Sequence, residues 1–132
     1  MNRRLKIFSL EEANSLLPQI EAILAGFEEK REAFRRLQDG LFFEELVEDF
    51  SPPDEKLRLL EENLVKLEEE IEKIQAFGCI LRHPDRGLID FLARRDEKLV
   101  YYCWRRGEGE IQYYHTLRGG FRERQPLLAS AA

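Results

Sequence analysis

The sequence predicts an α+β protein in which a long antiparallel helical hairpin, similar to a coiled coil, packs on a small antiparallel sheet of three or four strands. The first observation is a change of period: apolar residues recur every three or four positions before Gly78 and alternate with polar residues after it. The second is a division of charge, because residues 1–78 carry 11 basic and 19 acidic side chains whereas residues 79–132 carry 10 and 7. Acidic helices that dock on a basic sheet would produce this division.

The first helix is expected over residues 9–38. Ser9 precedes Glu12 by three positions, which is the capping-box pattern in which each side chain accepts a hydrogen bond from the other residue's backbone N–H. An apolar seam then follows in alternating steps of three and four residues, with Arg31 in one slot: Leu10, Ala13, Leu17, Ile20, Leu24, Phe27 and Phe34. This spacing places the seam on one side of a helix.

The second helix is expected over residues 53–77, after an apolar link at residues 40–50 that we expect to form a short helix of its own. Its seam is regular: Leu57, Leu60, Leu64, Leu67, Ile71 and Ile74. A helix of about 24 residues is about 36 Å long, which exceeds the length of the sheet. Part of the seam therefore needs another partner. The first helix can supply much of it as an antiparallel hairpin, and we expect a second copy of the chain to supply the rest in a homodimer.

Strands are expected at residues 88–94, 99–105 and 111–115, with 79–82 as a candidate fourth strand. The two connecting turns would set Asp90 opposite Cys103 and Cys103 opposite Tyr113. Alternation then separates two faces. The face expected to dock on the helices carries Ile89, Phe91, Ala93, Val100, Tyr102, Trp104 and Tyr114. The other, here called the mixed face, carries Leu88, Asp90, Leu92, Tyr101, Cys103, Arg105, Ile111, Tyr113 and His115.

These elements are expected to form one domain over residues 1–128, with the β module at 79–127 and a disordered tail at 129–132. Residues 1–20 contain no uninterrupted apolar run of signal-peptide length, and no window approaches the roughly 18 apolar residues of a membrane span. We therefore expect a cytoplasmic protein with no membrane partner. Two cysteines are too few for a disulfide framework, so both are expected to be reduced thiols.

Several motifs along the chain resemble those of a known family. They are the opening Phe-Ser-Leu-Glu-Glu-Ala-Asn of residues 8–14, Leu-Leu-Pro at 16–18, Gly-Leu-Ile-Asp-Phe at 87–91, Cys-Trp-Arg at 103–105, and Gly107, Glu108, Ile111, His115, Gly120, Phe121, Arg124, Pro126 and Leu127. With these motifs the chain resembles the bacterial family called domain of unknown function 2203 over almost its whole length. Members commonly have Trp and Pro where this chain has Tyr114 and Leu92. The resemblance implies a fold and a location for the site, and no reaction.

The candidate site is a polar cluster on the mixed face and its glycine loop, formed by Asp90, Arg105, Glu108, His115 and Arg124. The candidate metal ligands are Cys103, His115, Glu108 and Glu110, although no closely spaced pair preorganises them. Strand spacings place the Cα atoms of Asp90 and His115 about 11 to 12 Å apart, so we expect that one ion could barely be reached by both. If the cluster is structural instead, its arginines should pair with its carboxylates.

For function, the sequence favours a noncatalytic protein-interaction or scaffold module that self-associates. The alternative is a small-ligand or metal-binding protein that uses the mixed face. A second alternative is nucleic-acid binding through the arginines and aromatic residues after Gly78, which the net charge of −5 disfavours. No catalytic residues and no cofactor are assigned, and the sequence does not favour an enzyme.

Overall fold

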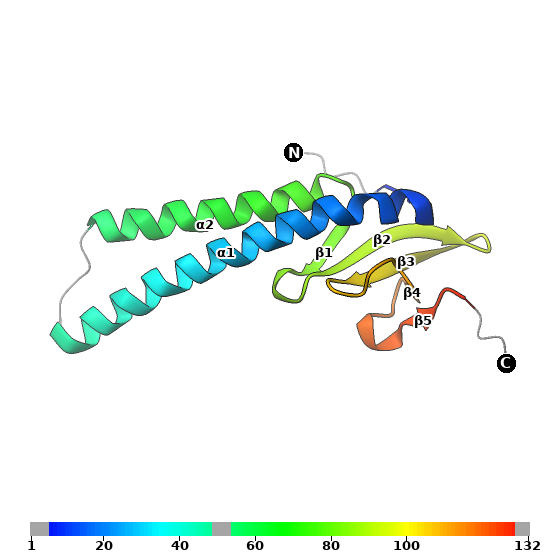
Figure 1. Cartoon of the computed structure of the whole chain (residues 1–132). Helices are drawn as coiled ribbons and strands as arrows, with labels where there is room; N and C mark the ends of the chain where they lie inside the picture. The colour runs from blue at the N-terminus through cyan, green and yellow to red at the C-terminus, as the bar shows by residue number, and fades with distance from the viewer. Residues whose placement is uncertain (1–5, 49–53, 129–132) are drawn as a thin grey trace.

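The computed structural model describes residues 6–48 and 54–128, and these residues form a helical hairpin with a five-stranded antiparallel sheet packed against one end of it (Figure 1). The helices are α1 (Leu10–Glu48) and α2 (Asp54–Gln75). The strands are β1 (Ile80–His83), β2 (Leu88–Arg95), β3 (Lys98–Arg105), β4 (Tyr113–Thr116) and β5 (Gln125–Pro126). The short 3-10 helices η1 (Pro84–Arg86) and η2 (Phe121–Glu123) precede β2 and β5. The α+β class is thereby confirmed.

Helix α1 begins with the expected capping box, in which Ser9 N–H donates to Glu12 Oε1 at 3.0 Å and Glu12 N–H donates to Ser9 Oγ at 3.1 Å. Its end differs from the prediction. The helix continues through Gly40 to Glu48, so its predicted end at residue 38 and the separate helix predicted for the link are wrong. A single glycine lowers helix stability by only about 1 kcal/mol, too little to end a helix. The remainder of the link, residues 49–50, lies outside the described residues.

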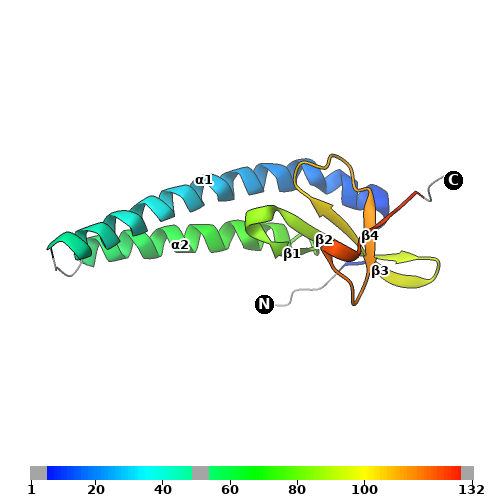
Figure 2. The same cartoon turned by 90° about the horizontal axis from the view of Figure 1, so that it is seen from below.

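The two helices lie side by side, and they extend well beyond the sheet in both views (Figures 1 and 2). Glu70 of α2 is 4% exposed and accepts hydrogen bonds from Lys30 of α1 and from Lys73. The seam of α2 is buried only near the sheet, at Leu67 and Ile74. No helix in the described part of the chain is both long and apolar enough to cross a bilayer.

The sheet has the order β1-β2-β3-β4-β5, so each strand pairs with its neighbours in sequence. The predicted register is confirmed: Asp90 pairs with Cys103, and Cys103 pairs with Tyr113. The prediction of three or four strands missed the fifth strand, β5. Gln125 and Pro126 alone make β5, and a strand of two residues that includes proline carries no alternation to detect.

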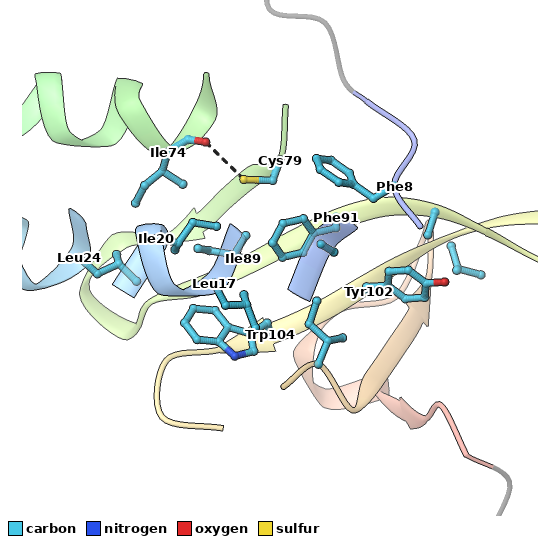
Figure 3. Packing of buried hydrophobic residues seen from close by; sticks show 14 residues of the cluster. Phe8, Leu17, Ile20, Leu24, Ile74, Cys79, Ile89, Phe91, Tyr102 and Trp104 are labelled. Carbon is cyan, nitrogen blue, oxygen red and sulfur yellow. Dashed lines mark hydrogen bonds between the residues drawn. The ribbon is translucent and has the colours of Figure 1, made fainter. Parts of the chain in front are cut away.

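One face of the sheet and the near ends of both helices form the hydrophobic core. Leu17, Ile20 and Leu24 of α1 belong to this cluster, and Trp104 of β3 lies beside Leu17 (Figure 3). The predicted docking face is confirmed, because six of its seven residues are buried and the seventh, Tyr114, packs against the core. Ile111 belongs to this core and to no strand, so its predicted place on the mixed face is wrong. Its backbone N–H donates to Asn14 Oδ1 of α1 at 2.9 Å.

Trp104 is 2% exposed, and its indole N–H donates to the Gly109 carbonyl at 2.8 Å. We predict that Trp104→Ala lowers the free energy of unfolding by about 3 to 5 kcal/mol, because it leaves a cavity between sheet and helix. Trp104→Phe keeps most of the apolar volume and should lose less. Urea unfolding measures both, and a Trp104→Ala variant as stable as the parent would contradict this packing.

Glu12 also pairs with Lys6, whose Nζ lies 2.8 Å from Oε2. The hydrogen bond from Lys6, followed by those from Ser9, lowers the pKa of Glu12 from 4.5 to about 2. Because the folded-state pKa lies below the unfolded value, these contacts stabilise the fold above pH 4.5 and the stabilisation is lost as pH falls toward about 2.

We therefore predict that Glu12→Gln is less stable than the parent at neutral pH and that the difference disappears in strong acid. Urea unfolding over a pH series measures it. Glu11→Gln is the control, because it removes a charge from the same first helical turn without altering the contacts of Glu12 with Lys6 and Ser9. An equal loss in both variants at neutral pH would show that the helix dipole, and not these contacts, is responsible.

Candidate functional site

Three different ligand-type side chains meet on the mixed face, on the side of the sheet away from the helices. They are Asp90 of β2, Cys103 of β3 and His115 of β4, and they are 2%, 1% and 2% exposed. One ligand atom from each, a carboxylate oxygen, Sγ and a ring nitrogen, lies within 4.8 Å of the other two. We call these three residues the buried trio.

Asp90 and His115 are in direct contact across β3. His115 Nε2 lies 3.1 Å from each carboxylate oxygen of Asp90. The expectation that one ion could barely be reached by both is therefore wrong. The Cα separation does not include the length of the side chains. Cys103, which lies between them on β3, is small, so the imidazole and the carboxylate can meet above it.

The ring of His115 is held in one orientation. Its Nδ1 lies 2.7 Å from the Thr116 carbonyl, and the Tyr101 ring packs at 5.6 Å between centroids. A carbonyl oxygen can only accept, so Nδ1 carries the proton. Nε2 is thereby directed at the carboxylate and the thiol. A metal-binding histidine commonly has this arrangement, with one nitrogen on a backbone carbonyl and the other free to ligate.

Arg82 of β1 is a fourth member of the site that the sequence did not reveal. Its Nε donates to Asp90 Oδ2 at 2.9 Å, and its guanidinium lies over the Tyr101 ring at 5.0 Å. Burial alone would lower the pKa of Arg82, but the hydrogen bond and charge of Asp90 raise it above the ordinary value. Ile80 pairs with Asp90, so Arg82, two positions further along β1, lies on the same face of the sheet. The sequence predicted β1 only as a candidate strand and gave it no register against β2, so this neighbour of Asp90 was missed.

Both cysteines are buried free thiols, and burial raises the pKa of each. Burial is the main cause for Cys103, followed by the charge of Asp90, and its pKa rises to about 12. The pKa of Cys79 rises to about 11, again through burial. Cys79 lies in the hydrophobic core, where its Sγ contacts the Ile74 carbonyl at 3.3 Å (Figure 3). The two thiols thus differ in surroundings, since only Cys103 faces other ligand-type groups.

The remaining predicted site residues are not members of the buried trio. Arg124 pairs with Glu108 at 2.9 Å, and the same carboxylate accepts the Arg105 backbone N–H at 2.7 Å. The guanidinium of Arg124 lies over the Phe121 ring at 4.0 Å, and that of Arg105 lies 5.8 Å from the same ring. Glu110 is exposed in the loop before β4. The five predicted cluster residues therefore form two groups, Asp90 with His115 and Glu108 with the arginines.

The buried trio opens into a hollow of about 360 Å³. Leu88 and Leu117 line it, together with Gly119, Gly120 and Phe121 of the segment that follows β4. Gly119 lies close to the site, because a Cβ there would meet Thr116 Oγ1 at 3.2 Å and His115 Cβ at 3.5 Å. A molecule in the hollow would thus contact the trio directly.

Fold and site together define a class: an α+β protein whose helical hairpin covers one face of a five-stranded antiparallel sheet, with a buried Asp-Cys-His trio on the other. A family model described as "Uncharacterized conserved protein (DUF2203)" matches residues 6–127, so the chain belongs to this family. The family resemblance of the sequence is thereby confirmed. No curated protein and no solved structure matches the chain.

Proposed function

We propose that this protein binds a divalent transition metal ion, with zinc as the best match, through the buried trio. The observation that carries the proposal is the convergence of three different ligand atoms within 4.8 Å on the floor of a hollow. Thiolate, imidazole and carboxylate are the ligands that zinc takes in proteins. The geometry thus favours the metal-binding alternative over an interaction module as the role of the mixed face.

The spacing of the ligand atoms suits such an ion. Tetrahedral zinc, with bonds of about 2.0 to 2.3 Å, holds its ligand atoms about 3.3 to 3.6 Å apart. Nε2 of His115 and the Asp90 oxygens are already 3.1 Å apart, and the widest separation in the trio, at most 4.8 Å, must close by about 1 Å. Small side-chain rotations can supply this movement. Arg82 holds Asp90 Oδ2, which leaves Oδ1 to ligate.

The charge of the ligands also supports the proposal. A thiol that binds a metal ion loses its proton, so Cys103 would present a thiolate beside the carboxylate of Asp90. Two negatively charged ligands match the charge of a divalent ion, and Arg82 forms an ion pair with the same carboxylate.

Three protein ligands would leave one coordination position for a further ligand, and the hollow that the trio lines would give access to it. Structural zinc sites use four protein ligands, whereas sites that bind water or a further ligand keep one position open. We infer that the bound ion exchanges its fourth ligand with molecules that enter the hollow.

The test is metal binding by untagged protein that has been stripped with a chelator. We predict one Zn²⁺ or Co²⁺ per chain, a thiolate-to-cobalt charge-transfer band, and a rise in melting temperature on addition of Zn²⁺. Cys103→Ser should abolish the band, and His115→Ala and Asp90→Asn should weaken binding by at least about tenfold.

Cys79→Ala is the matched control, since it removes the other buried thiol without altering the buried trio, and it should keep the band. Absence of bound metal in the parent protein would end the proposal. So would a Cys103→Ser variant with an unchanged cobalt spectrum.

We also propose self-association through α2. Leu57 and Leu64, one heptad apart on its seam, are 42% and 44% exposed. This part of α2 lies beyond the sheet, and acidic and basic residues flank it, including Arg58, Glu62 and Lys66. A second copy of the chain presents the same apolar spacing and the same mixture of charges, so two copies can cover each other's leucines.

Light scattering at micromolar concentration should give a multiple of 15.7 kDa. The double variant Leu57→Lys and Leu64→Lys should be monomeric, because lysine in this seam cannot be buried. Leu99→Lys is the control, as it changes another leucine, 40% exposed, on the sheet. A parent protein with the mass of one chain would contradict the proposal.

A further inference from the structure

A second hollow adjoins the one at the buried trio. It measures about 220 Å³, and four residues line it: Arg86, Leu88, Arg105 and Phe121. Leu88 and Phe121 also line the hollow over the trio. Arg105 follows Cys103 by two positions on the same face of β3, about 7 Å along the strand. The two hollows therefore form neighbouring parts of one depression in the mixed face.

Arg86 and Arg105 supply two guanidinium groups to this second hollow, and no acidic residue lines it. Neither forms an ion pair among the described residues, whereas nearby arginines do: Arg82 with Asp90, Arg106 with Glu21, and Arg124 with Glu108. The nearest acid in sequence to Arg86 is Asp85, which is engaged by Arg31. The second hollow thus has two guanidinium groups and no acidic residue in its lining.

The backbone fixes the approach of these two arginines. Gly87 has φ of 62°, and a Cβ at this position would lie 2.6 Å from Arg106 Cβ. Its carbonyl accepts the Arg106 backbone N–H at 3.0 Å. Glycine therefore allows the segment that carries Arg86 to lie against the end of β3 where Arg105 is located.

We propose that this depression binds a small anionic molecule, whose phosphate or carboxylate group lies between Arg86 and Arg105. Its apolar part lies on Leu88 and Phe121 and extends toward the buried trio. Guanidinium groups bind such oxyanions through paired charge-assisted hydrogen bonds. That the ligand's apolar part extends toward a metal ion rests on the proposed function, whereas the oxyanion site itself does not.

The test is calorimetric titration at low ionic strength with three probes: phenyl phosphate, benzoate and inorganic phosphate. The parent protein should bind at least one of the two aromatic anions, and the one it prefers identifies the oxyanion. If phenyl phosphate is preferred, inorganic phosphate should bind more weakly, because it lacks a ring to contact Leu88 and Phe121. Arg86→Ala and Arg105→Ala should each weaken the preferred anion by at least about tenfold.

Arg94→Ala is the matched control, since it removes the same charge from an exposed position on β2 outside both hollows, and it should leave affinity unchanged. Failure of both aromatic anions to bind, or equal weakening by all three variants, would overturn the proposal. The titrations are made on chelator-stripped and on Zn²⁺-treated protein. Zinc binding without anion binding would refute this proposal alone, whereas anion binding that depends on both arginines, in a protein that takes up no added Zn²⁺, would refute only the metal site.

Discussion

The site and the core both depend on the register between β2 and β3. Because successive side chains of a strand point to opposite faces, the pairing that buries Ile89 and Phe91 under α1 also directs Asp90 to the far face, opposite Cys103. A slip of one residue would exchange the two sets and place a carboxylate in the core. The packing of apolar side chains on α1 therefore stabilises the polar arrangement as well, although no helix residue belongs to the buried trio.

The charge division of the sequence has a structural counterpart at the contact between helices and β module. Arg106, at the end of β3, binds Glu21 and Glu28 of α1. Arg31 of α1 binds Asp85, so in this pair the helix supplies the basic residue and the β module the acidic one. These partly exposed pairs are each expected to contribute at most about 1 kcal/mol. They orient the hairpin on the sheet, while the core residues supply most of the stability.

Much of the fold could be predicted from the sequence, because it follows from period and register. Seam spacing predicts the two helices, and alternation predicts the two faces and the pairing of Asp90 with Cys103. The site could be predicted only in part. Contact between Asp90 and His115 depends on side-chain reach across a strand, and the position of Arg82 depends on how β1 pairs with β2. Neither is encoded in residue spacing.

The hairpin has a consequence for how the chain can vary. In the core cluster, α1 contributes no residue beyond Leu24 and α2 none before Ile74. The outer turns of the two helices thus touch neither the core nor the trio. Insertions or deletions of matched heptads in both arms would preserve their mutual packing and leave the mixed face unchanged. The length of the hairpin can therefore change in evolution without any change in the buried trio.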